Sequence, residues 1–114
     1  MGNKYGYNGK MGGGAGGMQN LMKQAQQMQQ KLIEAQQQLE ELQVVGTAGG
    51  GLVSITCNGK KDILAVSIKP EAVDPDDVEM LEDLMLAAIN DAYGKAKVEE
   101  ERLMAPFAAM KGFM

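Results

Sequence analysis

The chain has 114 residues and a mass of 12.2 kDa, which is enough for one small domain. It contains no histidine, no tryptophan and a single cysteine, Cys57. These absences argue against a Ser-His or Cys-His hydrolase, a structural zinc site and a disulfide-stapled secreted domain. The formal net charge of −4, taken as one number, argues against a nucleic-acid binder.

The glycine-rich segment 1–17 has no apolar run typical of a secretory signal, and we predict a disordered tail there. No stretch of the chain approaches the roughly 20 apolar residues that span a bilayer. Together with one free thiol, this predicts a protein of the reducing cytoplasm without a membrane partner.

A long helix is predicted from Met18 to Gln43, because no glycine or proline interrupts this run. Apolar residues recur there at alternating steps of three and four, which is typical of a coiled-coil seam. The seam consists of Met18, Leu21, Ala25, Met28, Leu32, Ala35, Leu39 and Leu42. Such a narrow apolar stripe requires a partner helix, either the second helix of this chain or the same helix of another copy.

Three short strands follow, predicted at 44–48, 52–57 and 62–69. Val53, Ile55 and Cys57 alternate onto one face of the second strand. Asn58-Gly59 predicts a hairpin, in a register that sets Ile55 opposite Leu64. The inner face of the third strand is then Leu64, Val66 and Ile68.

A second helix is predicted after Asp74-Pro75-Asp76-Asp77, where an aspartate caps the start and proline occupies the first turn. Helix capping explains this acidic cluster better than calcium binding, and Gly49-Gly50-Gly51 is better explained as a turn than as a phosphate loop. Pro106 ends the helix, and residues 105–114 form a C-terminal tail. An α-β-β-β-α chain of this size has a thin core, which favours a homodimer.

Charge is distributed unevenly along the sequence. Residues 1–43 carry a net +1, residues 44–70 a net +2, and residues 71–114 a net −7. The acidity therefore belongs to the last third of the chain, and the first helix and the hairpin tip are slightly basic. The overall charge no longer argues against contact with phosphates.

Several segments resemble the YbaB/EbfC family of bacterial nucleoid-associated DNA-binding proteins. They are NLMKQAQQMQ at 20–29, AGGGLV at 48–53 with Asn58-Gly59, DDVEMLEDL at 76–84 and AAINDA at 87–92. The resemblance spans a domain at 18–104 and implies an α+β fold, a three-stranded antiparallel sheet with long helical arms, in a tweezers-like homodimer.

The resemblance also implies binding of double-stranded DNA in the nucleoid, through the helical arms, with a role in gene expression or recombination. Carried onto this chain, it nominates Lys23, Gln24, Gln27, Gln30 and Lys31 on the first helix. Charge position adds two lysines at the hairpin tip, Lys60 and Lys61. We expect no enzymatic activity, no cofactor, no metal and no small-molecule substrate.

The alternative is a protein-interaction module, in which the methionine- and leucine-rich seam of the helical arms grips a partner chain. The two hypotheses differ in a measurable property, because phosphate contacts weaken steeply with salt and apolar contacts do not.

Overall fold

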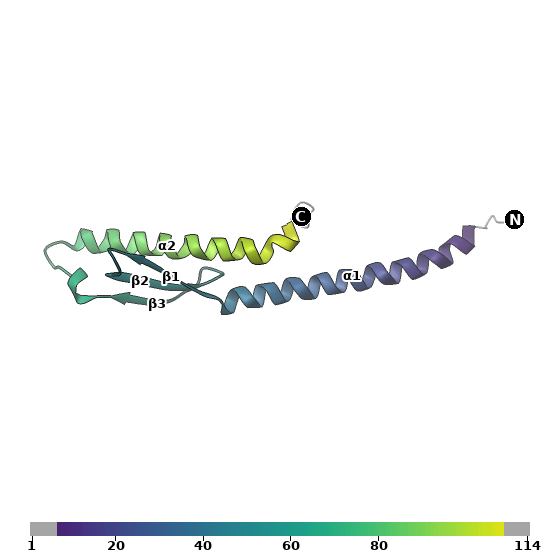
Figure 1. Ribbon diagram of the computed structural model, residues 1–114, viewed down its shortest axis with the longest axis horizontal. Coiled ribbons are helices and arrows are strands. Elements are labelled where there is room, and N and C mark those ends of the chain that lie inside the picture. The colour runs from purple at the N-terminus through teal and green to yellow at the C-terminus, as the bar shows by residue number, and fades with distance from the viewer. Residues whose placement is uncertain (1–6, 109–114) are drawn as a thin grey trace. The chain divides into compact units, whose positions relative to one another are not determined.

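The computed structural model describes residues 7–108, and the side chains of residues 17–108. The chain divides into two units, residues 1–34 and 35–114, which are described separately. The elements follow the order α1 (Tyr7–Glu41), β1 (Gln43–Ala48), β2 (Val53–Asn58), β3 (Ile63–Ile68) and α2 (Val78–Met104), as labelled in Figure 1. The predicted α-β-β-β-α order and antiparallel three-stranded sheet are confirmed.

Helix α1 is longer than predicted at its N-terminal end. It begins at Tyr7, within the segment expected to be a disordered tail, and residues 1–6 of that segment lie outside the described residues. Each residue added to an existing helix closes one further hydrogen bond, so the strong helix former at 18–41 extends into the glycine-rich stretch. The helix ends at Glu41, and the next residues enter β1.

The strands form a sheet in the order β1-β2-β3. The predicted hairpin register is wrong: Ile55 lies opposite Val66, two residues beyond Leu64. One residue of the shift comes from the turn, which pairs Cys57 with Ile63, and the other comes from the irregularity in β2–β3 pairing between Thr56 and Cys57. A shift of two residues preserves the face of each side chain, so Val53, Ile55 and Cys57 still form one buried face as predicted.

Helix α2 begins one turn later than the predicted cap. Asp77 occupies the cap position and its side chain accepts a hydrogen bond from the backbone N–H of Met80 at 3.2 Å. Asp74, expected to cap the helix, instead accepts from the backbone N–H of Asp76 at 2.9 Å in the preceding turn. After α2, a short 3-10 helix at Ala105–Phe107 buries the ring of Phe107, within the segment predicted as a tail.

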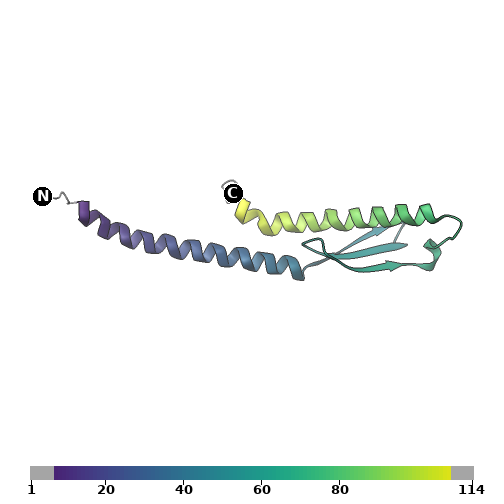
Figure 2. The ribbon, with the colours of Figure 1, turned by 180° about the vertical axis from the view of Figure 1, so that it is seen from behind.

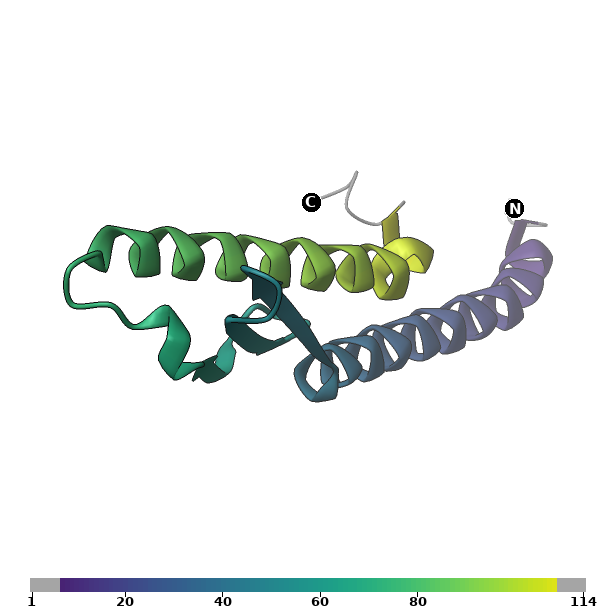
Figure 3. The same ribbon diagram turned by 60° about the vertical axis from the view of Figure 1, so that its left-hand side comes forward.

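Small residues set the distance between α2 and the sheet. Figures 2 and 3 show α2 running alongside the strands. Ala88, Ala92 and Ala96 are fully buried along one stripe of α2, against the buried face of β2. Gly46 of β1 lies so close to α2 that a methyl group there would overlap the backbone nitrogen of Ala92 and the carbonyl oxygen of Ala88. Helix α2 therefore packs on β1 and β2, and barely reaches β3.

Two side chains of α2 hold the outer edge of β1. The carboxylate of Asp91 accepts the backbone N–H of Thr47 at 3.0 Å, and the ammonium of Lys95 donates to the carbonyl oxygen of Val45 at 2.7 Å. Asp91 and Lys95 also form an ion pair at 3.3 Å. The Thr47 hydrogen bond, followed by the hydrogen bond and charge of Lys95, lowers the pKa of Asp91.

We predict that Gly46→Ala lowers the free energy of unfolding by about 2 kcal/mol or more. The added methyl group meets backbone atoms of α2, which cannot move aside as the end of a flexible side chain can. The matched control is Gly94→Ala in α2, where a methyl group meets no atom within 4 Å. That change should raise stability by about 1 kcal/mol, since alanine is the better helix former. Urea unfolding monitored by circular dichroism measures both, and equal midpoints for the two variants would contradict this account of the packing.

The lowered pKa of Asp91 predicts a pH-dependent effect. A carboxyl group with a depressed pKa in the folded state stabilises the fold above its ordinary value of 3.8, and this contribution is lost as the pH falls through the folded pKa. Asp91→Asn keeps an acceptor oxygen and removes the charge, so it should lower the thermal midpoint at pH 7, and its difference from wild type should shrink as the pH falls toward 3. Asp83→Asn on the same helix is the control, and it should leave the thermal midpoint unchanged at both pH values.

Candidate nucleic-acid interface

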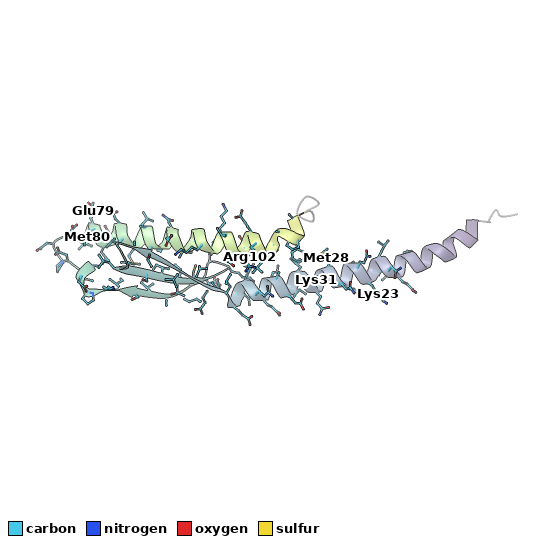
Figure 4. All side chains as sticks on the ribbon, viewed as in Figure 1. Lys23, Met28, Lys31, Glu79, Met80 and Arg102 are labelled. Carbon is cyan, nitrogen blue, oxygen red and sulfur yellow. The ribbon has the colours of Figure 1, made fainter. Side chains whose placement is uncertain are left out.

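The five residues nominated on α1 lie on adjoining rows of one helical surface. Lys23, Gln27 and Gln30 follow each other at steps of four and three, and Gln24, Gln27 and Lys31 at steps of three and four. We call these five residues the amide–lysine face. Lys23 and Lys31 are labelled on α1 in Figure 4, eight positions and about 12 Å apart along the helix axis.

The amide–lysine face is open to solvent. All five side chains are exposed, and in the described part of the chain neither lysine has a carboxylate within ion-pair distance. No side-chain hydrogen bond joins these residues to the rest of the described chain. Their donors are therefore available to a ligand, and an amide offers both a donor and an acceptor where a lysine offers positive charge.

The turn between β2 and β3 is held by Asn58. The Asn58 side-chain oxygen accepts the backbone N–H groups of Lys60 and Asp62 at 2.9 and 3.0 Å, and its amide nitrogen donates to the Asp62 carboxylate at 3.3 Å. Asn58 is buried, so these bonds satisfy polar atoms that water does not reach. The turn therefore presents Lys60 and Lys61 from a fixed backbone.

The two turn lysines differ in their electrostatic surroundings. The ammonium of Lys60 lies 2.8 Å from the carboxylate of Glu40, in the last turn of α1, so part of its charge is already compensated. Lys61 has no such partner among the described residues, and its backbone is left-handed with φ at 70°. Sequence reasoning missed Glu40, because twenty residues separate it from Lys60 and no local pattern links them.

The end of α1 is joined to the same turn by close backbone contact. Gly59 donates its N–H to the carbonyl oxygen of Leu39 at 2.7 Å, and a methyl group on Gly59 would approach Leu39 Cδ2 to 2.6 Å. The bond satisfies one of the carbonyl groups that a helix leaves without a partner at its C-terminal end. Lys60 and Lys61 are thus positioned next to the last turn of α1, within residues 35–114.

The nominated residues form two groups. The amide–lysine face belongs to residues 1–34, and the turn lysines belong to residues 35–114. Each group has an acid in its unit: exposed Glu34 lies three positions after Lys31 on α1, and Glu40 pairs with Lys60. The largest run of acids lies in α2 and the segment before it, with seven exposed acids and no lysine or arginine between Glu71 and Asp83.

The solvent exposure of the apolar seam of α1 changes along its length. Ala35 and Leu39 are buried in residues 35–114, whereas Met18 and Leu21 are 63% and 64% exposed. Met28 is also exposed and is labelled in Figure 4. The N-terminal part of the seam therefore has no partner within the described chain.

No metal-binding group of side chains is found in the described residues. They hold no group of three or more Cys, Asp and Glu side chains able to ligate a metal, and no described helix is apolar enough over its length to cross a membrane. Cys57 is fully buried, and burial raises the pKa of its thiol against the opposing effect of the Lys61 charge. Such a thiol is a poor nucleophile.

An exposed face of amides and lysines is typical of a surface that contacts phosphate groups. The chain belongs to the YbaB/EbfC DNA-binding family, whose family model matches residues 13–111. A nucleoid-associated protein from Clostridium novyi is 56% identical over 89 residues, which are 78% of this chain and 77% of that protein. Another, from Acetivibrio thermocellus, is 48% identical over 100 residues, which are 88% and 86% of the two chains.

The fold itself also has a solved counterpart. The crystal structure of an uncharacterized protein from Helicobacter pylori superimposes with a TM-score of 0.67, over 76% of this chain and 91% of that one. Sequence identity in this comparison is 20%, so the likeness is one of fold. The family model and the two relatives confirm the resemblance found in the sequence motifs, and this structure confirms the fold.

The left-handed backbone of Lys61 predicts that Lys61→Gly does not destabilise the fold. Glycine adopts this conformation without the clash of a Cβ atom, which costs an L-residue about 1 kcal/mol. The control is Lys61→Ala, which removes the same charge and keeps the Cβ. Lys61→Gly should unfold at a higher urea concentration than Lys61→Ala, and the reverse order would contradict the strained geometry of the turn.

Proposed function

We propose that this protein is a homodimeric, non-enzymatic component of the bacterial nucleoid in the cytoplasm, and that it binds double-stranded DNA mainly through the phosphate backbone. The amide–lysine face of α1 is the principal contact, with Lys60 and Lys61 as a secondary one. Two copies supply two such faces, so one dimer bends or bridges duplex DNA and thereby affects gene expression or recombination.

The observation that carries this proposal is that Lys23 and Lys31 are exposed and not engaged by other side chains of the described chain. Both are exposed on one helix surface, lack an ion-pair partner in the described chain and alternate with amide side chains. Lysines contact phosphates as mobile point charges, and glutamines add hydrogen bonds to phosphate oxygens or base edges. Two lysines on each face predict modest affinity that falls steeply as salt rises.

The turn lysines support the same function less strongly. Lys60 must leave or share the carboxylate of Glu40 to reach a phosphate, which reduces its contribution. Lys61 is the more available of the two, because it is exposed and held on a fixed turn. Binding energy from this turn therefore comes chiefly from Lys61.

A second candidate function is favoured by the exposed seam. Met18, Leu21 and Met22 are each more than 60% exposed, and they follow the spacing that packs one helix against another. In this alternative, α1 grips a partner protein through apolar contacts. Such binding depends little on salt and does not require Lys23 or Lys31.

The proposal predicts the behaviour of Lys23→Gln/Lys31→Gln. Fluorescence titration of labelled duplex DNA between 50 and 200 mM salt should show weaker binding by this variant. The slope of log affinity against log salt should decrease by about 1 for each lysine that contacts a phosphate. Wild-type protein that binds no duplex at low salt and tens of micromolar concentration would overturn the proposal and leave the protein-interaction alternative.

The matched control is Lys97→Glu, on the exposed surface of α2. It shifts the net charge by the same two units as the double variant and leaves α1 untouched. If both variants weaken binding equally, the effect is one of total charge, and the amide–lysine face is not the contact.

A further inference from the structure

Glu40 lies at a place where a helix disfavours a carboxylate. The last turn of α1 holds Glu40 and Glu41, and it holds no basic residue. Carbonyl groups without partners give the C-terminal end of a helix a partial negative charge, so carboxylates there lower the stability of the helix. The helix itself therefore does not favour an acid at position 40, and the carboxylate is compensated from outside α1.

The compensating group is the ammonium of Lys60, in the turn between β2 and β3. Its nitrogen lies 2.8 Å from a carboxylate oxygen of Glu40, and the Lys60 and Glu40 side chains remain 38% and 58% exposed. An ion pair this open to water and salt is weak. Another anion can therefore reach Lys60 from solvent and replace the carboxylate.

Backbone contacts keep the two side chains within reach of each other. Gly59, which precedes Lys60, donates its N–H to the carbonyl oxygen of Leu39, which precedes Glu40, at 2.7 Å. The turn and the helix lie so close at this point that a methyl group on Gly59 would overlap Leu39. An anion held on the same chain competes at a high effective concentration, which does not change when the protein is diluted.

We propose that Glu40 competes with DNA phosphates for Lys60 and thereby lowers the affinity of this protein for duplex DNA. The inference rests on the proposed function, since it concerns the secondary contact of that interface, and it adds Glu40 as a residue that sets the strength of the contact. Two effects act in the same direction. A phosphate must first break the Lys60–Glu40 pair, and the released carboxylate then repels the DNA backbone beside it.

The neighbouring residues provide matched comparisons on both sides of the pair. Lys61 is also exposed and has no ion-pair partner in the described chain, so a phosphate meets no competing carboxylate there. Glu41 is exposed in the same turn of α1 as Glu40, and no lysine or arginine of the described residues lies within ion-pair distance of it. Each member of the pair can therefore be compared with a neighbour of the same charge.

The acid is tested with Glu40→Gln and Glu41→Gln, which change the net charge equally. Glu40→Gln frees Lys60, and it should bind labelled duplex DNA about two- to fivefold more tightly at 50 mM salt, the fold-change that corresponds to an exposed ion pair. Its slope of log affinity against log salt should steepen by about 1, because Lys60 then neutralises a phosphate without releasing a carboxylate. Glu41→Gln should leave this slope unchanged. Equal slopes for the two variants overturn the inference.

The lysine is tested in the same titration. Lys60→Gln should leave the salt slope of the wild-type protein unchanged, whereas Lys61→Gln should decrease it by about 1. Glu40→Gln/Lys60→Gln keeps the net charge and should return the affinity and the slope to their wild-type values, because Lys60 is the group that Glu40→Gln frees. A double variant that binds as tightly as Glu40→Gln overturns the inference. Circular dichroism confirms that all variants keep the helix content of the wild-type protein.

The outcomes separate this inference from the proposed function. Wild-type protein that binds duplex DNA, with equal slopes for Glu40→Gln and Glu41→Gln, overturns the role of Glu40 and leaves the proposed function standing. Binding that appears only in Glu40→Gln upholds the role of Glu40 and overturns DNA binding by the wild-type chain. If neither the wild-type protein nor Glu40→Gln binds duplex DNA at low salt, both the inference and the proposed function are overturned.

Discussion

The close contact between β1 and α2 at Gly46 determines how the rest of residues 35–114 is arranged. With no side chain at Gly46 and only methyl groups at Ala88, Ala92 and Ala96, the backbones of strand and helix approach each other directly. A helix held this close to β1 covers β1 and β2, and its width of about 10 Å leaves little to cover a third strand spaced 4.8 Å further on. The bare face of β3 is therefore a consequence of the glycine on β1.

The same contact explains why the two sheet edges differ. Because α2 lies against β1, Asp91 and Lys95 on its flank reach the outward backbone groups of that strand. No part of α2 is placed to do the same for β3. The backbone groups of the β1 edge are thus bonded to side chains of α2, and β3 is left apolar, uncharged and exposed.

The sequence predicted the elements and their faces well, because alternation in strands and the three-four spacing in helices are local properties. Val53, Ile55 and Cys57 were placed correctly on one buried face. The hairpin register was wrong by two residues: the turn held by Asn58 contributes one, and the irregularity between Thr56 and Cys57 contributes the other. The helix cap moved from Asp74 to Asp77, because several aspartates in a row satisfy the same local preference.

In the candidate site, too, the sequence predicted the local features and not the contacts between distant residues. Lys23 and Lys31 share a helix with their amide neighbours, so sequence spacing alone placed them on adjoining rows of one surface. Lys60 was nominated for its charge, yet Glu40 compensates that charge across twenty residues of sequence, a contact that only the folded chain reveals. A phosphate must compete with a carboxylate at Lys60, whereas Lys23 and Lys31 exchange only water and counterions. Positive charge in a sequence therefore measures an affinity for DNA only after the neighbouring acids have been located, and α1 itself carries three of the fifteen acids, Glu34, Glu40 and Glu41.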